Sequence, residues 1–251
     1  MTPQSPIARL FLSFCLAFVS IVAYAWSGNT ADHSSYAELL NKYVADGEVD
    51  YRGLKGEEEQ LDRYLQMLDR TNPEELPRDE QYAFYINAYN AYTIKLVLDN
   101  YRIDSIKDIG GLLKSPWKIR FCKIGGKTLT LDEIEHEILR PRFKDPRVHF
   151  AINCASKSCP PLISEPYMGR TLDQQLNRAV RSFLNDPSQN RLDGNTLHVS
   201  KIFKWFEDDF NADVVGFFLG FADEDLKSRL SAQQGQIEIE YLDYDWGLNG
   251  E

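Results

Sequence analysis

The sequence has few cysteines, no excess of basic residues and no long apolar run, and each shortage narrows the possible functions. Its 251 residues include four cysteines, 28 Lys and Arg residues and 38 Asp and Glu residues, which give a formal net charge of -10. An acidic chain lacks the basic surface by which proteins bind nucleic acid or anionic membranes. We therefore expect neither kind of partner.

The cysteine spacing excludes two common kinds of site. No two cysteines are separated by two residues, which argues against a thioredoxin-type oxidoreductase and against the paired short spacings of a structural zinc site. The chain also has no internal repeat, low-complexity tract or Pro/Gly/Ser-rich linker. Because such features usually mark a divided chain, their absence predicts a single domain.

The longest apolar run is too short to span a bilayer. It covers residues 10–25, is broken by serines and follows a lone charge at Arg9, whereas a spanning helix needs roughly twenty apolar residues. The run closes on Ala23-Tyr24-Ala25, a small-x-small triplet. This pattern predicts a signal peptide over residues 1–25, cleaved after Ala25, and a periplasmic or secreted protein with no membrane span after cleavage.

Cleavage would leave 27 basic residues, 38 acidic residues and three cysteines: Cys122, Cys154 and Cys159. An exported protein folds in an oxidising compartment, and an odd number of cysteines leaves at least one thiol free or paired outside the chain. Residues 26–35 are predicted to form a flexible leader, and residues 36–251 a single globular domain.

Hydrophobic periodicity indicates an α+β fold in which helices predominate. A long helix is predicted over residues 79–101, and a β-hairpin near residues 118–130 turns at Gly125-Gly126. Thr130 and Glu133 form a capping box that begins a helix over residues 131–140. Further along, the patterns indicate a helix over residues 171–186 and strands within residues 195–200 and 236–246. We therefore expect a mostly helical single domain with a small antiparallel or mixed sheet.

Polar residues occupy positions where these patterns call for apolar ones. Glu135 falls on the apolar face of the helix over residues 131–140, where an unpaired carboxylate would cost roughly 3–5 kcal/mol. Two interpretations remain open: an ion pair with an arginine such as Arg140 or Arg147, or a carboxylate that orients a histidine. His136 lies at the edge of the apolar face, where it would border a cleft.

Asn87 and Asn90 lie on the buried side of the helix over residues 79–101. Buried amides need hydrogen-bond partners, and the backbone of an adjacent loop is their usual partner. We therefore expect these two side chains to hold a loop in place. Cys122, in the first strand of the hairpin, is expected to be a buried structural thiol.

The segment "DPRVHFAINCASKSCPPL", residues 145–162, combines a strand pattern with reactive side chains. Alternation predicts that Val148, Phe150 and Ile152 face the core, and that the opposite face carries Arg147, His149, Ala151 and Asn153. Cys154 follows at the end of this strand, where it would be open to chemistry. His136 and His149 are the candidate bases for its thiol.

The chain resembles the domain of unknown function 547 family over roughly residues 51–249. The resemblance rests on the segments "FYINAYNAYTI", "IEHEILR", "DPRVHFAINCASKSCPPL", "SKIFKWFEDDF" and "YDWGLN". It defines no activity. It implies that the following residues match the signature positions of the family: Asn87, Asn90, Glu135, His136, Arg147, His149, Asn153, Cys154 and Cys159.

Three functional hypotheses follow. The first is a cysteine-dependent hydrolase or transferase, in which Cys154 is the nucleophile, His136 or His149 the general base, and Glu135 or an asparagine the group that orients it. We expect no cofactor, and a small molecule or peptide as the ligand. The binding residues in this hypothesis are Asn87, Asn90, Arg147, Asn153 and Cys159.

The second hypothesis is a non-catalytic binding or structural domain with a disulfide between Cys154 and Cys159. So short a closed loop contributes roughly 2 kcal/mol and fixes a local shape more than the whole fold. The third is a metal site formed by His136, His149, Cys154 and Cys159.

Overall fold

A computed structural model describes residues 29–111, 115–233 and 235–251. The predicted signal peptide over residues 1–25 lies outside the described residues. Among the helices that are described, none is long and apolar enough to cross a membrane.

The described part of the predicted leader is integrated into the fold. Ala31 and His33 are buried, and helix α1 begins at Ser34. His33 Nδ1 lies 2.7 Å from the hydroxyl of Tyr64. The folded region therefore starts before residue 36, because His33 has a buried partner 31 residues away that no local pattern reveals.

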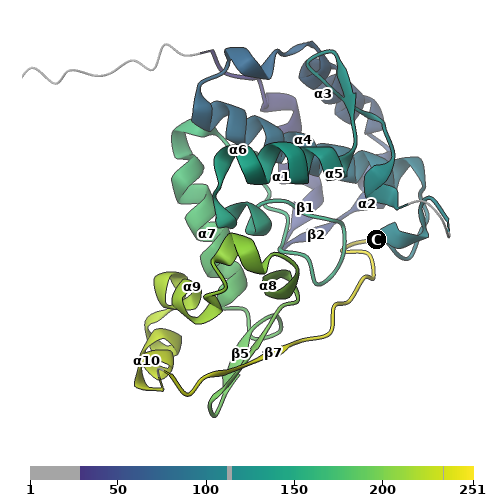
Figure 1. Cartoon of the computed structure of the whole chain (residues 1–251). Helices are drawn as coiled ribbons and strands as arrows, with labels where there is room; N and C mark the ends of the chain where they lie inside the picture. The colour runs from purple at the N-terminus through teal and green to yellow at the C-terminus, as the bar shows by residue number, and fades with distance from the viewer. Residues whose placement is uncertain (1–28, 112–114, 234) are drawn as a thin grey trace, which may run out of the picture.

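The N-terminal half consists of helices packed around one central helix, α4 (Figure 1). Its main elements are α1 (Ser34–Tyr43), β1 (Val44–Ala45), β2 (Glu48–Val49), α2 (Tyr51–Lys55), α3 (Glu58–Arg70) and α4 (Arg78–Asp99). Helix α4 confirms the helix predicted over residues 79–101. Nearly all of its side chains are buried, because neighbouring elements cover it on every side.

The predicted hairpin and the helix after it are both present. Strands β3 (Cys122–Ile124) and β4 (Lys127–Leu129) pair in antiparallel fashion. Gly125 and Gly126 have φ values of +57° and +74°, which suit a primed two-residue turn. Thr130 and Glu133 form the expected capping box.

The helix that follows is not uniformly α-helical. It starts as α5 (Leu131–Glu133), widens into a π-helical turn, η4 (Ile134–Leu139), and ends as α6 (Arg140–Phe143). A π turn holds an extra residue per turn and often marks a functional site. Here the wide turn carries Glu135 and His136.

The strand predicted over residues 147–153 is absent. Residues 146–150 form a 3-10 turn, η5 (Pro146–Phe150), whose first amide, that of Arg147, is capped by the side chain of Asp145. The alternating apolar residues are buried as expected, but in two different places. Val148 and Ile152 join the hydrophobic cluster around α4, whereas Phe150 joins a second cluster. The alternation therefore reflects a segment that runs between two cores, and not a strand with one buried face.

The second cluster belongs to the C-terminal half. Its helices are α7 (Leu172–Leu184), α8 (Ile202–Trp205), α9 (Val214–Phe221) and α10 (Glu224–Ala232), and its strands are β5 (Arg191–Asp193), β6 (Thr196–Val199) and β7 (Glu238–Tyr241). Strand β6 lies in the middle, antiparallel to β5 and parallel to β7. Other short 3-10 turns are η1 (Pro73–Glu75), η2 (Ile106–Asp108), η3 (Pro116–Lys118), η6 (Gly169–Thr171) and η7 (Glu207–Phe210).

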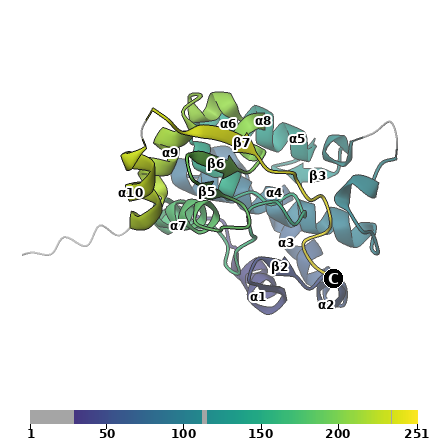
Figure 2. The ribbon, with the colours of Figure 1, turned by 90° about the horizontal axis from the view of Figure 1, so that it is seen from below.

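After β7 the chain returns to the N-terminal half, as the yellow segment in Figure 2 shows. We call residues 242–251 the C-terminal strap. Its Gly247 carbonyl accepts a hydrogen bond from the Lys157 amide, and the Asn249 amide donates to the Ala155 carbonyl. The strap therefore lies directly against the loop that follows Cys154. The architecture confirms a mostly helical α+β domain with small antiparallel and mixed sheets.

Candidate active site

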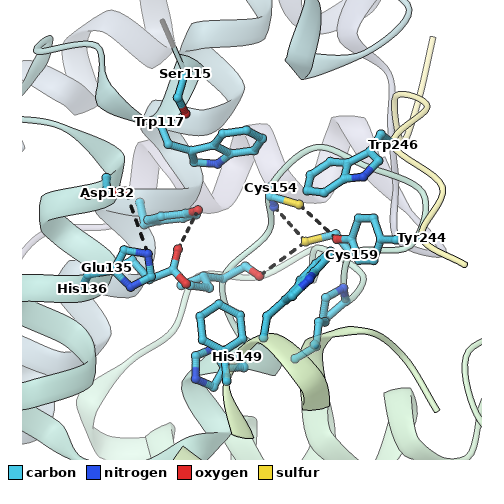
Figure 3. A pocket seen from close by; sticks show the side chains of 16 residues that line it. Ser115, Trp117, Asp132, Glu135, His136, His149, Cys154, Cys159, Tyr244 and Trp246 are labelled. Carbon is cyan, nitrogen blue, oxygen red and sulfur yellow. Dashed lines mark hydrogen bonds and ion pairs between the residues drawn. The ribbon is translucent and has the colours of Figure 1, made fainter. Parts of the chain in front are cut away.

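Five of the predicted site residues border one pocket of about 240 Å³. They are Glu135, His136, His149, Cys154 and Cys159. The remaining walls are largely aromatic and come from η3, α8 and the C-terminal strap. Figure 3 shows Glu135 and Cys154 on opposite sides of this pocket.

Cys154 sits at the start of a sharply bent loop. Ala155, the next residue, has a φ of +61°, a left-handed conformation that costs a non-glycine residue about 1–3 kcal/mol and is often found at active sites. Asn153 holds this bend: its Oδ1 accepts from the Ala155 amide and its Nδ2 donates to the Pro160 carbonyl, both at 2.8 Å. The strained turn fixes the direction of the thiol.

Hydroxyl groups surround the sulfur of Cys154. Ser156 Oγ lies 3.0 Å and the Tyr244 hydroxyl 3.3 Å from Sγ, and Ser156 Oγ donates to Tyr244 at 3.0 Å. Because each hydroxyl has one proton, Ser156 donates either to Tyr244 or to the sulfur, and the Tyr244 hydroxyl is able to donate to the sulfur in both cases. Figure 3 shows Tyr244 beside the two cysteines.

The two neighbouring thiols differ in acidity. The pKa of Cys154 is lowered, first by a hydrogen bond from the Cys159 thiol and then by Ser156 and Tyr244. The pKa of Cys159 is raised, mainly by burial. The Cys154 amide donates to Cys159 Sγ at 2.9 Å, and both cysteines are free thiols in the structure. The negative charge of the pair therefore resides on Cys154.

Glu135 faces the thiol from the π turn. It is buried, and its only hydrogen-bond donor among the described residues is the Tyr89 hydroxyl at 3.2 Å. Burial is the main reason that its pKa rises to about 7, and the charge of Cys154 contributes to the rise. A carboxyl group with such a pKa is able to donate or accept a proton near neutral pH.

The ion pair considered for Glu135 is not formed. Arg140 binds Asp209, with Nε 2.6 Å from Oδ2. Arg147 binds Asp145 and Asp173 instead. The sequence pattern showed that Glu135 is buried but not that a tyrosine of α4 would be its partner.

The two histidines have fixed partners. His149 Nε2 lies 2.7 Å from Asp209 Oδ2, and its ring stacks on Phe206 with the centroids 3.9 Å apart. His136 Nδ1 lies 2.9 Å from Arg140 Nη1. Burial lowers the pKa of both histidines, which favours their neutral forms. His149 then donates through Nε2 and keeps a lone pair on Nδ1.

The predicted contact between a histidine and the Cys154 thiol is missing. In the described structure neither His136 nor His149 is within hydrogen-bond distance of Sγ, which contacts the hydroxyls of Ser156 and Tyr244. Asp209 and Tyr244 are site residues that the sequence did not reveal. Both lie in segments that resemble the family, "SKIFKWFEDDF" and "YDWGLN", and this was the only available signal.

Of the predicted binding residues, Cys159 borders the pocket, whereas Asn87, Asn90 and Arg147 have structural roles away from it. Asn87 exchanges two hydrogen bonds with the backbone of Tyr167, and Asn90 binds the Ala151 carbonyl and the Asn153 amide at 2.9 and 2.8 Å. This confirms that the two amides hold loops in place. Arg147 is paired with acidic side chains, so its charge is already neutralised.

The third hypothesis, a metal site, gains no geometric support. No group of three or more His, Cys, Asp or Glu side chains within the described ranges has the spacing to hold a metal ion. His136 and His149 each already bind a protein partner through one ring nitrogen.

Residues 73–184 match the model of a family described as "Protein of unknown function, DUF547". No curated protein and no solved structure is significantly similar to the chain. The matched region runs from η1 to the end of α7 and contains Glu135, His136, His149 and Cys154. Asp209, Tyr244 and Trp246 lie beyond it.

Proposed function

Since residues 73–184 of this chain belong to the DUF547 family, whose name assigns no chemistry, we propose a function from the site itself: an exported cysteine-dependent hydrolase or acyltransferase. Cys154 is the nucleophile. Glu135 transfers protons, and the Tyr244 hydroxyl stabilises the charge on sulfur. The observation that carries the proposal is the position of the Cys154 thiol, 3.0 Å from Ser156 Oγ and 3.3 Å from the Tyr244 hydroxyl, in a pocket that also holds the buried carboxyl group of Glu135.

The reaction begins when the Cys154 thiolate attacks the carbonyl carbon of an ester, thioester or amide. A carbon–sulfur bond forms, and the bond from carbon to the leaving group breaks. Glu135 gives its proton to the leaving group, which leaves an acyl thioester on Cys154 and a carboxylate on Glu135. This division of roles requires the carboxyl group to be protonated while the thiol is ionised.

A second nucleophile completes the cycle. Glu135, now a carboxylate, takes a proton from water, and the resulting hydroxide attacks the thioester and releases a carboxylic acid. An alcohol or amine in place of water gives acyl transfer. The Cys154 thiolate and protonated Glu135 are restored, so the steps balance without an added oxidant or cofactor.

His149 is the second candidate base. His149 borders the pocket, and Asp209 fixes its ring through Nε2, which follows the usual order of nucleophile, base and orienting carboxylate. Glu135 is preferred because it faces Cys154 across the pocket (Figure 3). The comparison of Glu135→Gln with His149→Gln decides between them.

The experiment measures release of p-nitrophenol from p-nitrophenyl acetate by the reduced protein. We expect a rapid burst of one equivalent per chain, as acylation precedes slower hydrolysis, and an acetylated Cys154 by mass spectrometry. Cys154→Ala should abolish the burst. Cys122→Ser is the matched control, because Cys122 lies in the hairpin and not in the pocket, and it should retain the full burst.

Two outcomes would overturn the proposal. An equal burst in wild type and Cys154→Ala would exclude Cys154 as nucleophile. Protein isolated with Cys154 and Cys159 fully oxidised to each other, and inactive after reduction, would favour the non-catalytic domain with a structural disulfide.

Export is tested separately. Expression of the full chain followed by fractionation and N-terminal sequencing should yield a protein that begins at Trp26. A chain that retains residues 1–25 in the cytoplasm would contradict the signal peptide.

A further inference from the structure

The pocket beside Cys154 has an acidic lining. Among the sixteen described residues that border it there is no lysine or arginine, whereas two are carboxylic acids, Asp132 and Glu135, and a third acidic group is the Cys154 thiol. Asp132 is partly exposed and lies at the edge, with Oδ1 3.9 Å from His136 Nε2. Arg140, the nearest cation behind His136, is already bound to Asp209. The described lining therefore carries acidic groups and no basic side chain.

Aromatic rings form the other walls. Trp246 is at the centre of a cluster in which its ring centroid lies 4.5 Å from that of Tyr244, 5.7 Å from Trp205 and 5.8 Å from Trp117. The faces of such rings carry partial negative charge and attract cations, tryptophan most strongly. Phe206 extends the wall next to His149.

One ring of the cluster already binds a cation. The Lys107 ammonium lies 3.6 Å from the centroid of Trp246, a distance well within the range for cation–π attraction. Lys107 is not among the residues that border the pocket. Trp246 therefore attracts an ammonium group in this structure. The Phe206 ring is likewise covered by the Arg140 guanidinium, 5.0 Å from its centroid, whereas among the described residues no internal cation lies over the rings of Trp117, Trp205 or Tyr244.

We propose that the substrate of this site carries an alkylammonium group, primary or quaternary, which is held against the rings of Trp205, Tyr244 and Trp246 beside Cys154. The inference builds on the proposed function and names its substrate class. Carboxylate and phosphate groups are disfavoured by the same charges. The volume of about 240 Å³ is below the roughly 300–1,000 Å³ of sites that enclose a drug-sized ligand, so the pocket takes one end of a larger substrate or a small molecule.

The test uses three probes of similar size: choline, its neutral isostere 3,3-dimethylbutan-1-ol, and the anion 3,3-dimethylbutanoate, which keeps the tert-butyl group and has a carboxylate in place of the hydroxymethyl group. Each is tested for its ability to slow the alkylation of Cys154 in the reduced full chain by iodoacetamide, a neutral reagent. We expect choline to halve the alkylation rate at a concentration about tenfold lower than the neutral analogue, as expected for a desolvated cation–π site. The anion should give no protection.

Substitutions at Trp205 separate ring chemistry from the overall negative charge of the protein. Trp205 is 46% exposed, so its replacement leaves the core intact. Trp205→Leu should reduce the advantage of choline over its neutral analogue, and Trp205→Phe should retain most of it. Raising the salt concentration should weaken a general electrostatic effect but preserve the contribution of the rings.

Equal protection by choline and 3,3-dimethylbutan-1-ol would overturn the inference, as would a choline preference unchanged in Trp205→Leu. The outcome is independent of catalysis. Loss of the acyl burst with preserved choline selectivity would refute the proposed reaction alone, and a full burst without charge selectivity would refute the substrate class alone.

Discussion

Cys122 and Cys154 are both sheltered thiols, yet their surroundings give them opposite acidities. Cys122 lies in β3 with no exposed surface, and burial, followed by the charge of Glu133, raises its pKa far above the usual value. Cys154 lies at a strained turn where Cys159, Ser156 and Tyr244 lower its pKa. Burial alone disfavours a thiolate, so the hydrogen-bond donors around a sulfur decide whether a buried cysteine is inert or reactive.

The largest predicted effect is the difference in reactivity between the thiols of Cys122 and Cys154. We expect iodoacetamide at pH 7 to alkylate Cys154 of the reduced native protein at least ~1,000 times faster than Cys122, because Cys122 is neither ionised nor accessible. Peptide mass spectrometry of time points measures both rates. In urea the two rates should converge. Comparable alkylation rates of Cys122 and Cys154 in the native protein would contradict the prediction that their surroundings give them different reactivities.

Asn90→Ala should make Cys154 more like an ordinary thiol by releasing the loop that holds it. The substitution leaves the Ala151 carbonyl and the Asn153 amide without their partner, at a cost of roughly 2–5 kcal/mol for two buried groups. Urea unfolding measures the loss, and the rate of alkylation against pH reports the Cys154 pKa, which should rise.

Asn195→Ala is the matched control, since Asn195 makes one exposed hydrogen bond to the Gln236 carbonyl and should cost less than ~1 kcal/mol. An equally small loss of stability in Asn90→Ala would show that the loop before Cys154 does not depend on the side-chain amide of Asn90.

Glu135→Gln should change the pH dependence of stability. The pKa of Glu135 is raised from 4.5 to about 7 by burial, so the folded chain holds this proton more tightly than the unfolded chain. The free energy of unfolding therefore falls as the pH rises from about 4.5 through 7, by roughly 3 kcal/mol in total. Glutamine does not titrate, so the variant should be more stable than wild type at pH 8 and similar at pH 4.5.

Urea unfolding at these two pH values measures the effect. Glu59, an exposed residue of α3, is the control, and Glu59→Gln should show little difference between them. Equal stability changes at both pH values in Glu135→Gln would mean that burial does not perturb the carboxyl group.

Tyr244→Phe should have the smallest effect, because it removes one of several donors to the sulfur. We expect the pKa of Cys154 to rise and its alkylation at pH 7 to slow by about three- to tenfold, the equivalent of one hydrogen bond. Tyr241→Phe, in the neighbouring strand β7, should leave the rate unchanged. A Tyr244→Phe protein that reacts at the wild-type rate would show that Ser156 and Cys159 suffice.

Local patterns were reliable where neighbouring residues determine the structure. The Gly125-Gly126 turn, the capping box of Thr130 and Glu133, and the long helix α4 all depend on interactions within a few residues. The strand prediction for residues 147–153 is wrong because the alternating apolar residues of this segment belong to two separate clusters. Periodicity records which side chains are buried, but not which core buries them.

The sequence alone determined that Glu135 is buried, that Asn87 and Asn90 hold loops, and that Cys154 lies in an unusual segment. The tertiary structure decided that Cys154 meets Tyr244 from the C-terminal strap, 90 residues away, that Glu135 binds Tyr89, and that Asp209 takes both Arg140 and His149. In each case, charged and hydroxyl groups compete for hydrogen-bond and ion-pair partners in a low-dielectric interior. Only the complete tertiary packing brings the competitors within reach.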